Sequence, residues 1–208
     1  MIGGLPEKYG LDLGTVRFAA GCRCQMVVVD HRPQALAALE ALSGEIKSRP
    51  KIELRPAASL AQPLDEQALI FDLWVSTSAI QMLDSAGVLS YLDHVRRHAR
   101  CAVLFAPNKD NGAHLTISGL DGFHLSQLVT LCARARLRVL ESGYLDLPPF
   151  PPGIKRSEEA KAKASTSLLA RGGMVALEWW GRLERYFPRG LRRRYGHLVY
   201  AILRPEGS

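Results

Sequence analysis

The stretch from residue 69 to residue 108 restricts the fold more than any other part of this 208-residue chain. Two apolar runs of strand length, residues 69–76 and 101–108, flank a segment that is compatible with a helix. A continuous apolar run is typical of a parallel strand that is buried on both faces. The stretch therefore predicts a strand–helix–strand unit. Its strand ends, Ser76-Thr77-Ser78 and Pro107-Asn108, are candidate site positions, because open α/β sheets bind ligands at the carboxyl ends of their strands.

Strand-like and helix-like segments alternate through most of the chain. This alternation predicts a doubly wound, mostly parallel sheet with right-handed crossovers. Polar residues, glycines and prolines at residues 55–66 and 109–122 predict loops. The remaining strand patterns lie at residues 9–14, 25–30, 51–54, 138–144 and 197–203, and the helical patterns at residues 34–42, 88–98, 123–135 and 168–186.

The composition, with 47% hydrophobic and 23% charged residues, is that of an ordinary globular protein. No apolar run approaches the roughly 20 residues that span a bilayer. The first residues lack the charged-then-apolar pattern of a signal peptide, so we expect a cytoplasmic protein. The four cysteines have no partners at the spacing of a metal site, and we expect free core thiols. His94 and His98, one helical turn apart, lack a third ligand and are expected to be solvated.

Much of the formal net charge of +7 comes from six arginines at residues 182–194. A basic patch of this kind can bind nucleic acid, anionic lipid or an acidic partner. Aromatic residues make up only 7% of the chain, and they do not alternate with the arginines as in single-strand binders. Nucleic acid is therefore the less favoured partner. A protein partner through residues 168–195 and formation of oligomers are left open.

The order of the segments resembles that of the class I S-adenosylmethionine-dependent methyltransferases. Residues 27–30 resemble the second strand of that family, and residues 71–76 and 101–108 resemble its fourth and fifth strands. Residues 135–144 resemble the last helical turn and the sixth strand, and residues 197–203 fit the seventh. The resemblance implies an α/β, Rossmann-like, mostly parallel seven-stranded sheet with an antiparallel last strand and a helical insertion before it.

This resemblance also implies a domain organisation and an activity. Residues 1–150 would form the methyltransferase core, residues 151–195 a helical cap or insertion, and residues 196–208 the final strand of the core sheet. The implied activity is methyl transfer from S-adenosylmethionine to a small-molecule or lipid-like acceptor. Because the sulfonium is already activated, the protein mainly aligns the acceptor, and no catalytic residue is assigned from the sequence.

The cofactor residues implied by the resemblance lie at strand ends. Asp30 matches the acid that holds the ribose hydroxyls, although the same carboxylate could cap the helix that begins near residue 33. Asp12 and Gly14 stand where the family has its glycine-rich cofactor loop, although Asp12 could also be a plain turn acid. His31 and Ser76 are the other candidate cofactor-binding residues.

Ser78, Asn108 and His114 are the candidate substrate-binding residues, although serines at such positions can simply cap the next helix.

Two features depart from the family pattern. The loop at residues 12–15 has one glycine where the family typically has three, and a different start of the chain would account for that loss. Residues 55–58, Arg-Pro-Ala-Ala, hold no acid where the family contacts the adenine amino group. Both departures favour an alternative in which the fold is catalytically inactive and serves as a binding or assembly subunit.

Overall fold

The computed structural model describes a defined part of the chain. It covers residues 2–3, 25–30, 33–34, 36–37, 40, 52–57, 59, 61, 70–77, 79–118, 121–147, 180 and 182–207. The candidate site residues Asp12, Gly14, His31 and Ser78 lie outside these ranges. So do Cys22, Cys24 and most of the predicted cap at residues 151–195.

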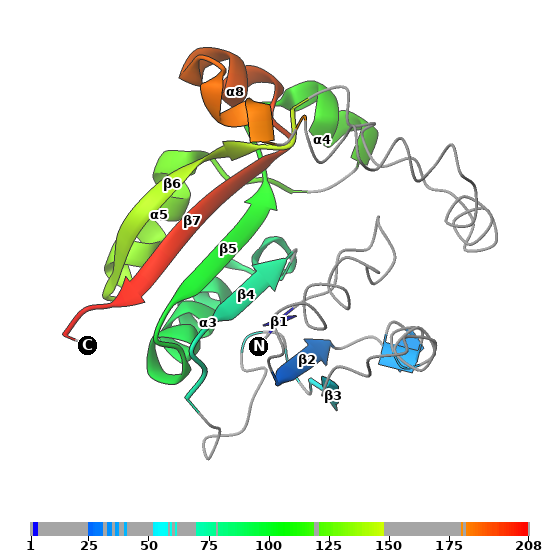
Figure 1. Cartoon of the computed structure of the whole chain (residues 1–208), viewed down its shortest axis with the longest axis vertical. Helices are drawn as coiled ribbons and strands as arrows, with labels where there is room; N and C mark the ends of the chain where they lie inside the picture. The colour runs from blue at the N-terminus through cyan, green and yellow to red at the C-terminus, as the bar shows by residue number, and fades with distance from the viewer. Residues whose placement is uncertain are drawn as a thin grey trace.

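The described strands form one sheet in the order β3-β2-β1-β4-β5-β7-β6 (Figure 1). Strands β1 to β5 pair parallel to one another, whereas β7 lies antiparallel between β5 and β6. This arrangement confirms the predicted Rossmann-like α/β fold. The strands are β1 (Ile2–Gly3), β2 (Met26–Asp30), β3 (Ile52–Pro56), β4 (Trp74–Thr77), β5 (Ala102–Pro107), β6 (Leu137–Leu145) and β7 (Leu198–Pro205).

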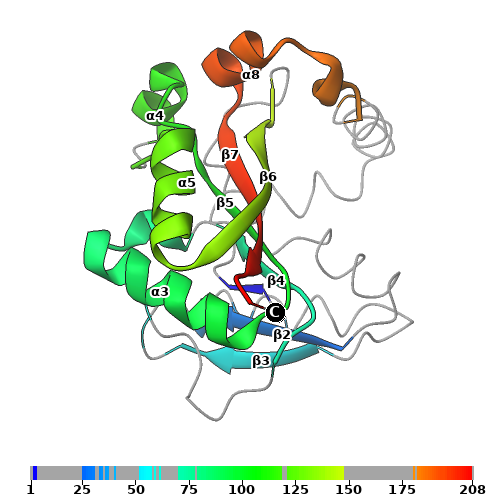
Figure 2. The same ribbon diagram turned by 90° about the vertical axis from the view of Figure 1, so that its left-hand side faces the viewer.

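Helices α3 (Ser85–His98) and α5 (Leu125–Arg134) cover the same face of the sheet (Figure 2). Asp84 caps α3, because its Oδ1 accepts a hydrogen bond from the Gly87 N–H at 2.7 Å. None of the described helices is long and apolar enough to cross a membrane. The other helical elements are the 3-10 turns η1 (Ile80–Met82) and η2 (Glu184–Tyr186), and the short helices α4 (Gly112–Ser118) and α8 (Arg189–Tyr195).

The core lies between the sheet and these two helices. Trp74, Leu92, Leu104, Leu128 and Leu203 are all fully buried there. Full burial of an aliphatic or aromatic side chain stabilises a fold by roughly 1.5–3 kcal/mol. Apolar contacts of this kind hold α3 and α5 against the strands that carry the candidate site.

The first strand lies earlier than predicted. Ile2 pairs with Val28 and Val75, and Gly3 pairs with Val29 and Ser76, so β1 holds the central position between β2 and β4. Residues 9–14, where the sequence predicts the first strand, lie outside the described residues. The sequence did not indicate a strand at Ile2 and Gly3, because two paired residues are too short a run to show a strand period. The connection to β2 then begins at residue 4, which leaves the dozen or more residues that a parallel crossover needs.

Strand β4 begins later than predicted, at Trp74 rather than at residue 69. Phe71 is held outside the ladder: its N–H donates to the His98 carbonyl at 2.8 Å, and its own carbonyl accepts from the Arg100 N–H at 2.9 Å. Ile70 remains 67% exposed. The start of this apolar run is therefore hydrogen-bonded to the chain at the end of α3 and is not part of a buried strand.

A short helix, α4, occupies much of the predicted loop at residues 109–122. Asn111 Oδ1 accepts from the His114 N–H at 3.1 Å, which is the bond of a helix N-cap. The Thr116 hydroxyl donates to the Gly112 carbonyl at 2.9 Å. The prediction of a loop is wrong because it took the polar composition of this stretch for the absence of a helix.

Two histidines on α3 are buried, and the prediction that they are solvated is wrong. His94 is 2% exposed and His98 is 6% exposed. The His94 ring meets the edge of Trp74 at a centroid distance of 5.9 Å, and it lies 4.5 Å from the His98 ring. The buried face of α3 is therefore wider than its aliphatic residues alone indicate.

Candidate functional site

The carboxyl ends of the parallel strands meet at one edge of the sheet (Figure 1). The pairing of Gly3 with both Val29 and Ser76 sets β1, β2 and β4 level with one another at this edge. Ligands of open α/β sheets bind at such an edge, near the point where the strand order reverses. Here that point lies between β1 and β4.

Asp30 is the last residue of β2 and is fully buried. Its backbone carbonyl accepts a hydrogen bond from the Ala57 N–H at 2.9 Å, which fixes the end of β2 against the end of β3. A buried carboxylate is tolerated only where hydrogen bonds compensate for its lost hydration. The position of Asp30 is the predicted one, the carboxyl end of the second strand.

Ser76 is also fully buried, but it lies beneath α3. It follows Trp74 by two residues, so both side chains point to the same face of β4. The Trp74 Nε1–H donates to the Tyr91 hydroxyl at 2.9 Å. Burial raises the pKa of Tyr91 to about 12, and the neighbouring Ser76 and Trp74 partly counter this effect.

Asn108 ties the end of β5 to the turn between α8 and β7. Its Nδ2 donates to the carbonyls of Arg193 and Gly196, both at 2.8 Å, and its Oδ1 accepts from the Asp110 N–H at 3.0 Å. Nδ2 of Asn111 reaches the same turn, at 3.3 Å from the Gly196 carbonyl. The amide of Asn108 is therefore used within the protein, and it positions the neighbouring residues.

Asp110 is the centre of a polar network at the same edge. Its Oδ1 lies 3.0 Å from His124 Nδ1 and 3.1 Å from Arg193 Nη2, and the Tyr144 hydroxyl donates to its Oδ2 at 3.4 Å. Burial disfavours the charged carboxylate, but the hydrogen bonds and charges of Arg193 and His124 outweigh it, so the pKa of Asp110 lies below its usual value. Burial and the nearby Asp110 raise the pKa of Tyr144.

A second carboxylate–histidine pair lies at the start of β7. His197 Nδ1 is 3.1 Å from Asp146 Oδ2, and its ring stacks on that of His114 at 4.4 Å. Buried Glu184 accepts from the backbone N–H groups of Asp146 and Leu147, both at 2.9 Å. Burial raises the pKa of Glu184, and these two hydrogen bonds partly counter it.

The edge combines groups that can position a polar molecule and hold a proton. A carboxylate beside Nδ1 of His197 or His124 favours the tautomer that leaves Nε2 as an acceptor. No group of histidine, cysteine and acidic side chains among the described residues could hold a metal ion. The arrangement therefore suits the binding and orientation of a polar molecule, with Asp30 on the β2 side of the same edge.

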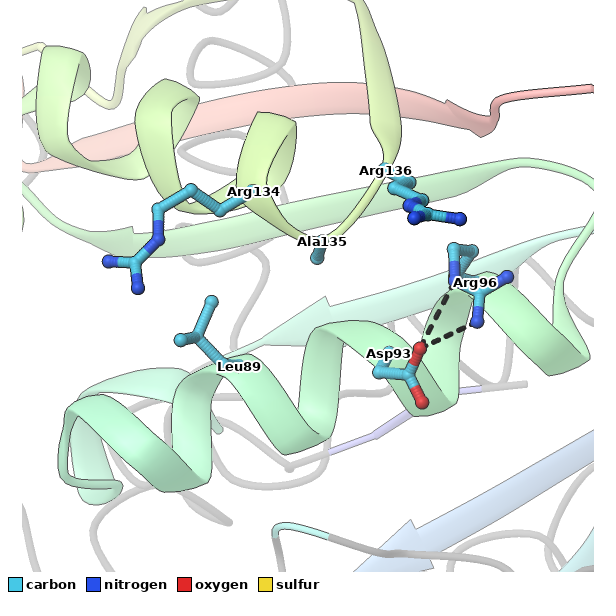
Figure 3. Close-up of a pocket in the computed structure, with 6 residues that line it drawn as sticks. All are labelled: Leu89, Asp93, Arg96, Arg134, Ala135 and Arg136. Atoms are coloured by element: carbon cyan, nitrogen blue, oxygen red, sulfur yellow. Dashed lines mark hydrogen bonds and ion pairs between the residues drawn. The ribbon is translucent and has the colours of Figure 1, made fainter.

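A hollow of about 330 Å³ lies at the opposite edge of the sheet, between the C-terminal ends of α3 and α5 (Figure 3). Asp93 accepts two hydrogen bonds from Arg96 there, at 2.7 and 3.1 Å, and these bonds are the main cause of its lowered pKa. None of the described candidate site residues, Asp30, Ser76, Asn108 and His114, lines the hollow. Its lining residues are Leu89, Asp93, Arg96, Arg134, Ala135 and Arg136.

The sequence matches no known protein family and no curated protein. Its fold nevertheless matches solved structures. The glycopeptide N-methyltransferase MtfA complexed with (S)-adenosyl-L-methionine aligns with a TM-score of 0.57 and 11% identity, over 99% of this chain and 81% of that chain. A TehB-like SAM-dependent methyltransferase from Corynebacterium glutamicum aligns at 0.54 and 11%, over 99% and 79%.

A putative sarcosine dimethylglycine methyltransferase from Galdieria sulphuraria aligns at 0.55 and 16%, over 98% of this chain and 76% of that chain. The chain therefore has the fold of class I S-adenosylmethionine-dependent methyltransferases, which confirms the resemblance drawn from the order of its segments. At these identities the comparison establishes the fold.

The structure brings two of the described candidates, Asn108 and His114, together beside the turn before β7, and it places Asp30 and Ser76 near the ends of β2 and β4. Sequence reasoning missed the polar network around Asp110 and the pair of Asp146 with His197. A signal for Asp110 was present, because it follows β5 directly within Asn108-Lys109-Asp110-Asn111. The partners Arg193 and His197 are far away in sequence, and only the antiparallel return of β7 brings them to this edge.

Proposed function

We propose that the protein transfers a methyl group from S-adenosylmethionine to an acceptor bound at the carboxyl edge of the sheet. The observation that carries this proposal is the strand order, in which β7 lies antiparallel between β5 and β6. The fold is shared with structures solved with S-adenosylmethionine or sinefungin. The buried Asp30 at the end of β2 supports the same proposal, because the resemblance assigns the ribose-binding carboxylate to this position.

In this proposal Asp30 accepts hydrogen bonds from the ribose hydroxyls of the cofactor. When bound, S-adenosylmethionine supplies a methyl group that needs no further activation. The remaining residues align the acceptor and exclude water. Ser76, fully buried near the end of β4, is kept as a candidate cofactor contact. The roles of Asp12, Gly14 and His31 at the cofactor remain predictions from the resemblance.

The acceptor would lie beside the end of β5. Asn108 positions the chain there, and His114, stacked on His197, forms part of the wall; Ser78 is kept as a candidate contact. We propose a small-molecule or lipid-like acceptor. Residues 151–195 would form the helical insertion and lid that precede the last strand of a seven-stranded sheet.

Calorimetric titration with S-adenosylmethionine tests the proposal. We expect a dissociation constant in the micromolar range, weakened about tenfold or more by Asp30→Asn, because hydrogen bonds to a charged group contribute about 1.5–3 kcal/mol. The matched control is Asp72→Asn, since the Asp72 side chain is 92% exposed and far from the edge. Absence of heat and of any thermal shift at millimolar cofactor would contradict the proposal.

One observation favours the alternative, a binding or assembly subunit without catalytic activity. β3 ends at Pro56, level with Asp30, and two alanines follow where the family has an acid for the adenine amino group. The alternative predicts that the protein binds neither S-adenosylmethionine nor S-adenosylhomocysteine. The same titration therefore separates the two functions.

A further inference from the structure

Large apolar side chains are exposed on the η2–α8 segment, directly before β7. Leu183 is 49% exposed, Tyr186 70%, Leu191 44% and Tyr195 43%. Isolated exposed apolar residues are common on protein surfaces, but a group of them in one short segment marks an interaction site. We call these four side chains, with the exposed Arg185, Arg189 and Arg194, the η2–α8 surface.

The helical spacing gathers part of this surface on one side of α8. Leu191, Arg194 and Tyr195 are three and four residues apart, which places their side chains next to one another on a helix. Leu183 and Tyr186 are likewise three residues apart in the preceding turn. Figure 2 shows both turns at the same end of the molecule, beyond the carboxyl end of β5.

Charge on this surface is of one sign. The stretch from residue 182 to residue 195 contains a single acid, Glu184, and its side chain is turned inward, 3% exposed, against the N–H groups of Asp146 and Leu147. Arg193 faces the network and pairs with Asp110. The outward arginines therefore have no acidic neighbour within their own segment.

Hydrogen bonds from buried side chains hold the η2–α8 segment in place. Asn108 and Asn111 bond to the carbonyls of Arg193, Tyr195 and Gly196, and Glu184 bonds to the end of β6. These bonds fix the backbone that carries the exposed side chains. The apolar exposure is thus a property of the folded segment.

We propose that the η2–α8 surface binds the anionic headgroup region of a lipid bilayer. Apolar and tyrosine side chains enter the boundary between headgroups and acyl chains, while arginines reach the phosphates from apolar stems. Each basic residue near an anionic membrane contributes to binding, and a cluster of them indicates a lipid-binding surface. The mixture of leucine, tyrosine and arginine, with its acid turned inward, matches this pattern.

Nucleic acid fits the same surface less well. Arg185 lies 4.8 Å from the centroid of the Tyr186 ring, and Arg194 lies 5.4 Å from that of Tyr195, so the chain's own arginines cover one face of each ring. Only the other face of each ring is then left for stacking with a base. Leu191, half exposed, adds apolar area that a phosphate backbone does not use.

The surface lies at the same end of the sheet as the candidate site, because the start of β7 pairs with the end of β5 through Leu198 and Pro107. A bilayer bound there would face the carboxyl edge. If the proposed methyl transfer holds, on which this part of the inference rests, the acceptor is a lipid of the bound membrane. Binding to the bilayer itself does not require the cofactor, so the two proposals fail separately.

Co-sedimentation of the full chain with vesicles tests the inference. We expect binding to phosphatidylcholine vesicles that contain phosphatidylglycerol, weakened by salt, and little binding to phosphatidylcholine alone. The double variants Arg185→Gln/Arg194→Gln and Leu191→Gln/Tyr195→Gln should each weaken binding by about tenfold or more. The matched control is Arg138→Gln/Arg204→Gln, which removes an exposed cross-strand arginine pair at the opposite end of β6 and β7.

Circular dichroism and thermal unfolding confirm that each variant is folded. Several results would overturn the inference: no vesicle binding, equal binding to neutral vesicles, or equal losses in the control variant. Stronger binding to a single-stranded oligonucleotide than to vesicles, unchanged by Leu191→Gln/Tyr195→Gln, would instead identify a nucleic-acid surface. Binding to polyglutamate but not to vesicles would identify a surface for an acidic protein.

Discussion

Two buried polar clusters of this molecule are stabilised in opposite ways. At the carboxyl edge, Asn108 and Asp110 are surrounded by hydrogen-bond partners and by an arginine, and the pKa of Asp110 is lowered so that its charge is kept. On the buried face of α3, His94 and Tyr91 lie among aromatic rings. Burial shifts their pKa values to about 4 and about 12, so that both stay neutral.

The difference teaches where the protein keeps charge and where it excludes it. The edge cluster belongs to the candidate site and can hold polar or charged groups. The α3 cluster belongs to the core and tolerates polar atoms only in their neutral form. Four expected outcomes test this contrast.

The largest effect is expected for Asn108→Ala. This change leaves the Arg193 carbonyl without its side-chain donor and the Asp110 N–H without an acceptor, and the Gly196 carbonyl keeps only the longer bond from Asn111 Nδ2 at 3.3 Å. Buried groups without partners cost about 1–3 kcal/mol each, so we expect a loss of about 3 kcal/mol in the free energy of unfolding. Urea denaturation measures it, with the exposed neighbour Lys109→Ala as the control. Equal stabilities would show that Asn108 is not a structural link.

Gly196→Ala should be the next largest, at about 2 kcal/mol. A Cβ at this position would lie 2.6 Å from the Arg192 carbonyl and 3.0 Å from the Leu145 carbonyl, so backbone must move. Gly190→Ala, in the same segment, has open space around its Cβ and should raise stability by about 0.5–1 kcal/mol. Thermal unfolding compares them. Changes of the same sign would refute close packing at the end of α8.

Acid should weaken the α3 cluster through His94. Burial, then the charges of His98 and Arg97, lower its pKa from 6.5 to about 4, while Asp93 opposes them. Between these values the unfolded chain binds more protons than the folded one, so stability is complete above pH 6.5 and falls as the pH drops toward 4.

We expect this loss to be about 1.5 kcal/mol, less than the full shift implies, because water approaches an imidazole as it becomes charged. Urea denaturation at several pH values measures it. His94→Phe keeps an aromatic ring against Trp74 and should remove this part of the pH dependence. An unchanged slope in the variant would show that His94 is not the titrating group.

Asp110→Asn should have the smallest effect, a loss of about 1 kcal/mol or less, since Arg193 is largely exposed and its pair is screened. The folded pKa of Asp110 lies below the ordinary 3.8, so its contribution is present above that pH and disappears as the pH falls through the folded pKa. The variant and the wild type should therefore converge in strong acid. A gap that widens with acid would contradict a lowered pKa.

The sequence was sufficient for the elements whose pattern is local. The β-branched run before Asp30 predicts β2, and the apolar stripe of residues 88–98 predicts most of α3. It was insufficient for β1, where Ile2 and Gly3 show no period and are recognisable as a strand only through their pairing with β2 and β4.

The candidate site divides in the same manner. Asp30 and Asn108 end apolar runs and could be found by reading along the chain. Tyr144, Arg193 and His197 reach the edge only because β7 returns antiparallel between β5 and β6, a pairing that no local pattern encodes. The wrong expectation for His94 has a related cause, because an i, i+4 pair of polar rings gives no sign of which face of its helix meets Trp74.

The hydrogen bonds of Glu184 have a consequence for how the chain can diversify. They join residue 184 to the N–H groups of Asp146 and Leu147, so the stretch between residues 147 and 184 starts and finishes at one fixed point of the sheet. The free-energy cost of closing a loop grows only slowly with its length. A change in the number of residues between these two anchors should therefore cost little free energy as long as both anchors stay in place. The two anchors, which lie close together in the folded protein, thus make this position suitable for grafting segments from other chains.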